Sequence, residues 1–184
     1  MINLYDELQY VTCYRENRLK FAHGVLNNKS LFPELLDICF LVRDETSIKA
    51  CWILEFVCKE QLEWLLPHID TFTSNISKIK YDSAIRPVAN ICELLCKAYF
   101  GRNPSPVKEN LNHKHLQRIT ETCFDWLIND EKVAAKAYSM NALFLLGLKI
   151  DWIHPELKRI LELGFGNHSA AYKARARHIL RKLK

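Results

Sequence analysis

Two glutamates, Glu55 and Glu93, have the residue type and setting that acid/base chemistry requires. They lie in the similar apolar segments 53–59 (ILEFVCK) and 91–97 (ICELLCK). Two carboxylates on neighbouring helices can share a proton, which is how acid/base pairs arise. The alternative is structural: each carboxylate is exposed or forms ion pairs with the nearest basic residues, Lys49, Lys59, Arg86 and Lys97. The pattern favours the structural alternative and leaves the carboxylate pair as a candidate site.

Basic residues are concentrated at the C-terminal end of the chain. Residues 154–184 hold eight Lys and Arg against two Glu, whereas the whole chain has a net charge of +5. On a helical wheel of the last segment, one stripe beside the apolar face contains Lys173, Arg177, Arg181 and Lys184. Such a stripe can neutralise about four phosphates. It can equally be a solvated terminal helix, or the polar cap that a stack of repeats needs.

No motif for a cofactor, a metal or a usual hydrolase is present. The chain has five glycines and lacks the P-loop, G-x-G-x-x-G, G-x-S-x-G and H-E-x-x-H patterns. His113 and His115 form the densest histidine pair, but no further ligand stands at the usual spacing, so we interpret them as part of an exposed loop or a helix start. We therefore expect no cofactor, no metal and a protein that is not an enzyme.

The composition is that of an ordinary globular protein. Of its 184 residues, 49% are apolar and 26% are charged. The seven cysteines are odd in number, show no C-x-x-C spacing and lie in apolar stretches, which predicts reduced, buried thiols. There is no apolar leader segment and no run of 18 apolar residues, so we expect a cytoplasmic protein without a membrane partner. The four tryptophans have apolar neighbours and are predicted to pack in the core or between repeats.

Apolar residues recur at spacings of three and four along nearly the whole chain, which predicts helices. One predicted face has Leu35, Leu36, Cys39 and Phe40, a second has Ile48, Cys51, Trp52 and Phe56, and a third has Leu116, Ile119, Cys123, Phe124 and Leu127. Strict alternation is hard to find, and so few glycines and prolines do not supply the turns of an all-β fold. The expected fold class is therefore all-α.

An internal repeat is the most informative feature. Besides the two glutamate segments, which are 38 residues apart, four candidate second helices open alike, with a basic residue at Lys49, Arg86, Lys136 and Lys173. Acidic turn residues Asp44, Asp82 and Asp130 precede the first three, and the fourth departs with Asn167 and His168. The steps between the basic residues are 37, 50 and 37, and the longer step contains an insertion. A period in this range is typical of stacked helix pairs.

This pattern resembles the HEAT/armadillo-like helical repeat, in which an acidic turn precedes V-R-x-x-A-x-x-A-L-x-x-L on the second helix. The resemblance covers about residues 31–184 and implies a right-handed α-α superhelix, a solenoid of about four to five helix pairs. We accordingly expect one domain over 1–184. Residues 1–30 would form N-terminal capping helices, 31–184 the repeats, and 101–112 a loop insertion.

Three functions follow as hypotheses. The first is a non-catalytic scaffold or adaptor that binds a protein or peptide partner. The second comes from the resemblance to HEAT-like DNA-repair glycosylases, which bind DNA on a basic concave face; here the candidate residues are Lys49, Arg86, Lys136 and Lys173 with the C-terminal stripe. We favour the first, and the oligomeric state is left open.

The third hypothesis is also a resemblance. The segment D-S-A-I-R-P-V-A-x-I-C-E at 82–93 is similar to that of short helical chains named adenylosuccinate lyase. Members of that lyase family are much longer and carry the signature G-S-S-x-M-P-x-K-x-N. Here the nearest match is Ser139-Met140-Asn141, inside a predicted repeat helix and without the glycine loop. The lyase activity is therefore the least supported of the three.

Overall fold

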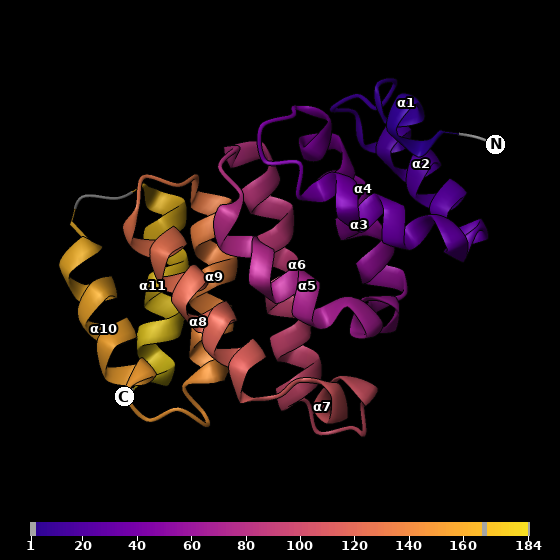
Figure 1. Ribbon diagram of the computed structural model, residues 1–184. Helices are drawn as coiled ribbons and strands as arrows, with labels where there is room; N and C mark the ends of the chain where they lie inside the picture. Colours follow the sequence, from indigo (N-terminus) through magenta and orange to yellow (C-terminus); the bar gives the residue numbers. More distant parts are fainter. Residues whose placement is uncertain (1–2, 167–168, 184) are drawn as a thin grey trace. The chain divides into compact units, whose positions relative to one another are not determined.

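The computed structural model describes residues 3–166 and 169–183, and its regular elements there are helices (Figure 1). The α-helices are α1 (Leu4–Leu8), α2 (Arg15–Asn27), α3 (Phe32–Cys39), α4 (Thr46–Glu60), α5 (Ile69–Asn75), α6 (Asp82–Phe100), α7 (Pro106–Asn110), α8 (His113–Ile128), α9 (Val133–Leu146), α10 (Ile153–Gly164) and α11 (Ala170–Lys182). Three 3-10 helices cover Lys29–Leu31, Leu62–His68 and Ile76–Lys78. The all-α prediction is confirmed, and the described residues contain no strand.

The second helices predicted from the repeat are α4, α6, α9 and α11, and each contains its predicted basic residue in its first turns. Ser169 caps α11 as its type suggests, because its side-chain oxygen accepts a hydrogen bond from the Tyr172 backbone N–H at 3.4 Å. The insertion predicted over 101–112 is not wholly a loop, since it contains α7. Asn167 and His168, where the fourth repeat departs from the pattern, lie outside the described residues.

The chain divides into two compact units, Met1–Ile91 and Cys92–Lys184, which we call the N-terminal unit and the C-terminal unit. The boundary falls within α6. In the N-terminal unit, α4 is the central helix and packs against α1, α2 and α3. Because several helices cover it, it buries one broad side that includes Ala50, Ile53, Leu54 and Val57.

This central position of α4 changes the role of the face predicted from its spacing. Cys51 is buried as expected, but Ile48, Trp52 and Phe56 are only half-buried. Cations cover the aromatic rings: the Arg18 guanidinium lies 5.4 Å from the Trp52 ring centroid, and the Arg15 guanidinium lies 5.9 Å from that of Phe56. The predicted apolar face is therefore the partly solvated side of α4, and its opposite side forms more of the core.

Pro87 explains a second contact of Trp52. Proline has no backbone N–H, so the Ser83 carbonyl one turn earlier in α6 lacks its usual helical donor. The Trp52 indole N–H donates to that carbonyl oxygen at 2.8 Å. A partly buried carbonyl is satisfied in this way, and the start of α6 is tied to α4.

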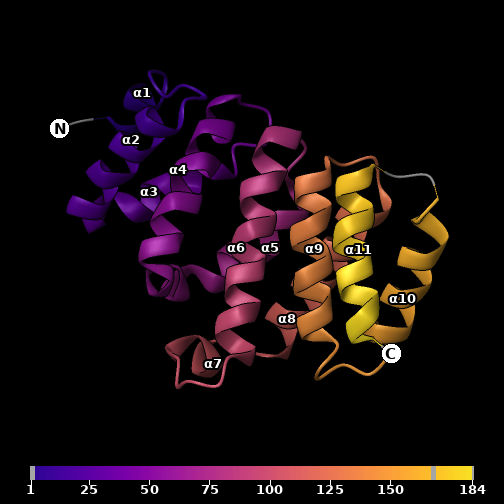
Figure 2. The ribbon, with the colours of Figure 1, turned by 180° about the vertical axis from the view of Figure 1, so that it is seen from behind.

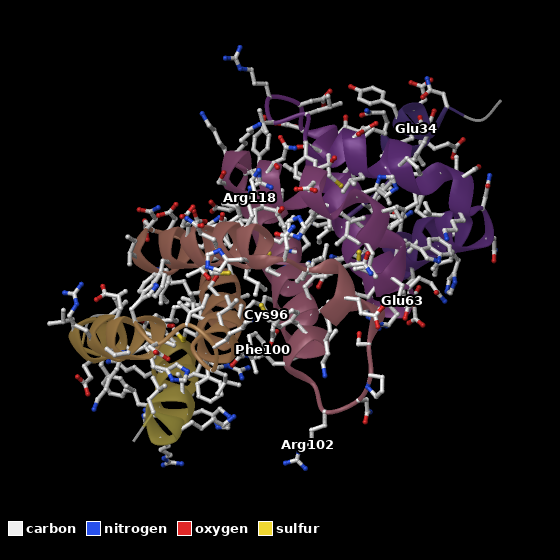
Figure 3. The ribbon with its side chains drawn as sticks, turned by 60° about the horizontal axis from the view of Figure 1, so that its bottom comes forward. Glu34, Glu63, Cys96, Phe100, Arg102 and Arg118 are labelled. Carbon is white, nitrogen blue, oxygen red and sulfur yellow. The ribbon has the colours of Figure 1, made fainter. Side chains whose placement is uncertain are left out.

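In the C-terminal unit, α9 is the central helix and packs against α8, α10 and α11, and Figure 2 shows it beside α11. The predicted face of α8 is largely confirmed, because Leu116, Ile119, Cys123 and Leu127 are buried. Figure 3 shows Cys96 of α6 among the helices, whereas Arg102 on the following loop points away from them.

Gly147, which follows α9, permits a close approach of α10. A Cβ atom at this position would lie 2.0 Å from a ring carbon of His154. With glycine there, a ring nitrogen of His154 lies 2.8 Å from the Phe144 carbonyl oxygen. The His154 ring also stacks on the Phe144 ring, with centroids 5.4 Å apart. The Phe144 side chain is thereby held in one place.

All seven cysteines are free thiols, and six of them are buried as predicted, whereas Cys13 is exposed. Burial raises the pKa of the Cys58 and Cys96 thiols, which keeps them protonated and unreactive. Over the described part of the chain, no helix is both long and apolar enough to cross a bilayer.

Candidate binding sites

The Glu55 carboxylate of α4 is saturated with partners inside the N-terminal unit. Its Oε1 accepts hydrogen bonds from Lys59 Nζ at 2.8 Å and Asn90 Nδ2 at 2.7 Å. The Arg86 guanidinium donates to both oxygens, at 3.1 Å to Oε1 and 2.7 Å to Oε2. This two-pronged contact ties α6 to α4, so one of the predicted basic residues, Arg86, is used to neutralise one of the predicted carboxylates.

Burial and pairing oppose each other at Glu55. The residue is 1% exposed, and burial by itself would raise the pKa of its carboxyl group. The hydrogen bonds from Arg86, Lys59 and Asn90 outweigh that effect and hold the pKa below its ordinary value. Glu55 is therefore an ionised anchor for three donors and has no free oxygen for proton transfer.

Glu93 has fewer partners in the C-terminal unit. It accepts hydrogen bonds from Lys97 Nζ and Asn141 Nδ2, each at 2.8 Å and each to Oε1. Among the described residues, no hydrogen bond reaches its Oε2. The side chain of Lys97 is 57% exposed, whereas Glu93 itself is 3% exposed. The side chain is therefore largely buried, and its Oε2 is available at the wall of a groove.

Glu93 lies in a groove of about 400 Å³ formed by α6, α9 and α11, which we call the α9/α11 groove. Its basic lining comes from Lys97, Arg175, His178 and Lys182. The remaining lining comes from Glu93, Tyr138, Asn141, Phe144 and Leu145. The exposed side of the groove is cationic, and its buried side presents a carboxylate, an amide and aromatic rings.

Three of the predicted inner-helix basic residues make contacts within the protein or are buried. Lys49 Nζ donates to the Gln9 carbonyl oxygen at 2.6 Å, and Arg86 binds Glu55. Lys136 is only 4% exposed. Burial lowers its pKa, although the nearby carboxylates Asp130 and Glu131 act in the opposite direction. In this structure Lys136 therefore does not reach a surface where it could meet a phosphate.

The predicted stripe on α11 is partly engaged. Lys173 Nζ donates to the Gly166 carbonyl oxygen at 3.2 Å, and the Arg177 guanidinium lies 5.6 Å from the Phe165 ring centroid. Arg177 and the exposed Arg181 border the same shallow hollow, whereas Lys184 lies outside the described residues. The other side of the helix carries Arg175 and Lys182, which are not part of the predicted stripe and which line the α9/α11 groove.

A larger and more apolar groove runs between α8 and α10, with a volume of about 830 Å³, and we call it the α8/α10 groove. Trp152 stacks on Phe124 there with ring centroids 5.5 Å apart. Trp152 is 55% exposed and Ile128 is 60% exposed, so the prediction that all four tryptophans are packed away is wrong for Trp152. The acidic residues along this groove are Glu121, Asp125 and Glu156.

The remaining candidates from the sequence have structural positions. His115 is buried at the start of α8, where it forms a capping box with Asn112, as expected of a helix start. Ser139 and Met140, the nearest match to the lyase signature, are fully buried within α9. No flexible glycine loop surrounds them, so this segment does not form the catalytic loop of that lyase family.

The sequence analysis gave Asn90 no role, considered Asn141 only in the comparison with the lyase signature, and predicted that Trp152 is packed. The two asparagines carry a weak signal, because each is a polar residue inside an apolar helix and each binds a repeat-related glutamate. Nothing in the sequence indicated that Trp152 is exposed, because the residue that follows it, Ile153, is apolar.

Comparison with known families agrees with this architecture. The family model of a HEAT repeat domain matches residues 10–183. The chain therefore belongs to the HEAT repeat domain family, as the repeat pattern implies. No curated protein and no solved structure was found to match the chain.

Proposed function

We propose that the protein is a non-catalytic helical-repeat scaffold that binds a protein or peptide partner. The exposed Trp152 in the α8/α10 groove is the observation that carries this proposal. A tryptophan costs free energy when its ring faces water, and binding sites in proteins are enriched in such residues. The groove is also the most spacious of those described.

The chemistry of the groove specifies the kind of partner. Phe124, Ile128 and Trp152 offer an apolar surface for one or two aliphatic or aromatic side chains. Glu121 and Asp125 are exposed beside them, while Glu156 is held by Arg159 with a contact of 2.6 Å. The complementary partner is therefore an apolar segment flanked by Lys or Arg.

Selection of displayed peptides on the intact protein tests this proposal. Peptides selected by the wild-type protein are expected to carry an aromatic or leucine residue flanked by basic residues. Their affinity is expected to fall about tenfold or more on the Trp152→Ala variant, which removes an interfacial aromatic side chain. Trp64→Ala in the N-terminal unit is the matched control, since it removes a half-buried tryptophan elsewhere.

Two outcomes contradict the proposal. One is a set of selected peptides that bind the Trp152→Ala variant as tightly as the wild type. The other is binding that high salt abolishes completely, because salt screens the charge pairs with Glu121 and Asp125 but not the apolar contact. If Trp64→Ala loses binding and Trp152→Ala keeps it, the binding site is not the α8/α10 groove.

Nucleic-acid binding is the second candidate function, and the exposed basic residues of α11 are the observation that favours it. Arg175, Arg177, Arg181 and Lys182 are all exposed on this one helix. A titration with duplex DNA at two salt concentrations tests it, with binding expected at low salt and weakened as salt rises. Absence of binding at low salt removes this candidate.

A further inference from the structure

The α9/α11 groove has a lining that neither scaffold binding nor a simple basic stripe requires. It combines a buried carboxylate, aromatic rings and four cationic or histidine side chains within about 400 Å³. We propose that this groove binds a nucleoside phosphate whose base carries an exocyclic amine, either as a free nucleotide or as one unit of a single strand. This proposal does not depend on the α8/α10 groove.

The available oxygen of Glu93 selects the base. Both hydrogen bonds to Glu93 end on Oε1, and among the described residues Oε2 receives none. Glu93 is only 3% exposed and lines the groove, so a ligand N–H that reaches Oε2 forms a charge-assisted hydrogen bond there in place of one to water. The exocyclic amine of cytosine is such a donor, whereas the carbonyl at the same place in uracil is an acceptor and is repelled.

The basic side chains of the groove are suited to bind the phosphate of such a ligand. Arg175, His178 and Lys182 come from α11, and Lys97 comes from α6. Lys97 is already paired with Glu93, but the positive charge of Arg175 and Lys182 is not neutralised by any carboxylate contact in the described structure. A phosphate offers several acceptor oxygens that such side chains bind through charge-assisted hydrogen bonds.

Two aromatic rings of the groove are suited to stack on the base of such a ligand. Tyr138 and Phe144 of α9 line the groove and are half-buried. Phe144 is held from behind by the His154 ring, and the Lys182 ammonium lies 5.2 Å from its centroid. Nucleic-acid bases stack on aromatic rings of this kind, and cations beside the ring contact the backbone.

The alternatives fit the lining less well. An acidic peptide would bring a carboxylate toward the Glu93 carboxylate, and like charges repel in a buried setting. A DNA duplex presents its cytosine amines only at the floor of the major groove, and the side chain of Glu93, which is 3% exposed, does not project far enough to enter it. The volume is also within the range of small-molecule sites, which is roughly 300–1,000 Å³.

Calorimetric titration of the full chain with CMP and UMP at low salt tests the proposal, because these ligands differ in the group presented to Glu93. We expect CMP to bind roughly tenfold more tightly than UMP. Ten-residue oligomers of C and of U distinguish the two sources. A single-strand site binds the C oligomer much more tightly than CMP, whereas a free-nucleotide site does not. Equal affinity for CMP and UMP, or no binding of any of the four probes, overturns the proposal.

Variants on opposite sides of α11 locate the site. The double variant Arg175→Gln/Lys182→Gln is expected to lose CMP binding by about tenfold or more, because it removes two phosphate ligands. Arg177→Gln/Arg181→Gln removes the same charge from the same helix outside the groove and is the matched control. If the control variant loses binding and the groove variant keeps it, the groove is not the site.

Glu93→Gln tests the selection of the base. The amide keeps the size of the side chain but also presents a donor, so the preference for CMP over UMP is expected to disappear. A preference that survives this substitution contradicts the role given to Glu93. Trp152→Ala leaves CMP binding unchanged, so the failure of either proposal is recognised independently of the other.

Discussion

The two units contain related carboxylates in related segments, yet the structure treats them differently. Glu55 in the N-terminal unit binds Lys59, Arg86 and Asn90 through both oxygens. Glu93 in the C-terminal unit binds Lys97 and Asn141 through a single oxygen. Each carboxylate thus binds a lysine one turn later in its own helix and an asparagine from the next inner helix. That helix is α6 for Glu55 and α9 for Glu93.

The difference comes from one position on the partner helix. Arg86 precedes Asn90 by four residues, and the residue that precedes Asn141 by four is Ala137. Four residues are about one helical turn, so both positions lie on the same face as their asparagine. Arginine completes the network around Glu55, and alanine leaves an oxygen of Glu93 available. A repeated structural motif can therefore become a binding site by losing one side chain.

Removal of each carboxylate gives the largest expected contrast. Glu55→Ala leaves Arg86 and the buried Asn90 without their acceptor, so we expect a loss of about 3 kcal/mol in the free energy of unfolding. Glu93→Ala leaves a lysine that is already exposed to water, so we expect a loss of about 1 kcal/mol. Urea denaturation followed by circular dichroism measures both. Equal losses would mean that the two networks do not differ as their contacts indicate.

Rebuilding the missing arginine should convert the second network into the first. In Ala137→Arg, a guanidinium one turn before Asn141 is expected to bind Glu93 and to raise the free energy of unfolding by about 1 kcal/mol. The same variant should lose CMP binding, because Oε2 is then occupied. Ala134→Arg, at an exposed position one turn earlier on α9, is the control. A stabilised variant that still binds CMP would contradict the role of Oε2.

The pH dependence of stability should separate the two carboxylates further. Because the folded-state pKa of Glu55 lies below its ordinary value, its contribution is present at neutral pH and is lost as the pH falls through that folded-state pKa. Glu55→Gln should therefore be less stable than the wild type at pH 7 and approach it in acid. Urea midpoints at several pH values measure the difference. A gap that stays constant down to acidic pH would show that ionisation of Glu55 is not the cause.

Loss of the contact between Trp52 and Ser83 should have an effect about as small as that of Glu93→Ala. Trp52→Phe keeps an aromatic ring on α4 but removes the N–H that donates to the Ser83 carbonyl, which we expect to cost about 1 kcal/mol. Because this contact holds the first turn of α6 near Arg86, the loss should be smaller when Arg86→Met is already present. A double-mutant cycle of urea midpoints measures this coupling. If the losses in the free energy of unfolding from the two substitutions simply add, the Trp52 contact is not coupled to the Glu55 network.

Much of the fold was predictable from local patterns. The apolar spacing located the inner helices, and the basic residue in the first turns of α4, α6, α9 and α11 marked their starts. The face of α8 was predicted almost completely because α8 packs through one side. The face of α4 was not, because a central helix is apolar around most of its circumference and periodicity then has no single direction.

The sites were less predictable for a related reason. The sequence identified Glu55, Glu93 and the basic side chains as chemically interesting, and it offered structural ion pairs as one outcome for the carboxylates. It placed the basic stripe on one side of α11, whereas the α9/α11 groove uses Arg175 and Lys182 from another. A helical wheel gives directions within one helix but does not say which neighbour each direction meets.

The amino-acid sequence by itself determined that this protein is helical and repetitive, because periodicity and capping act over a few residues. Tertiary structure alone decided which charges are neutralised, which carboxylate keeps an available oxygen and which tryptophan remains exposed. Those outcomes depend on distances between side chains far apart in the chain, such as Glu55 with Arg86 and Glu93 with Asn141. Such distances are fixed only when the helices pack against one another.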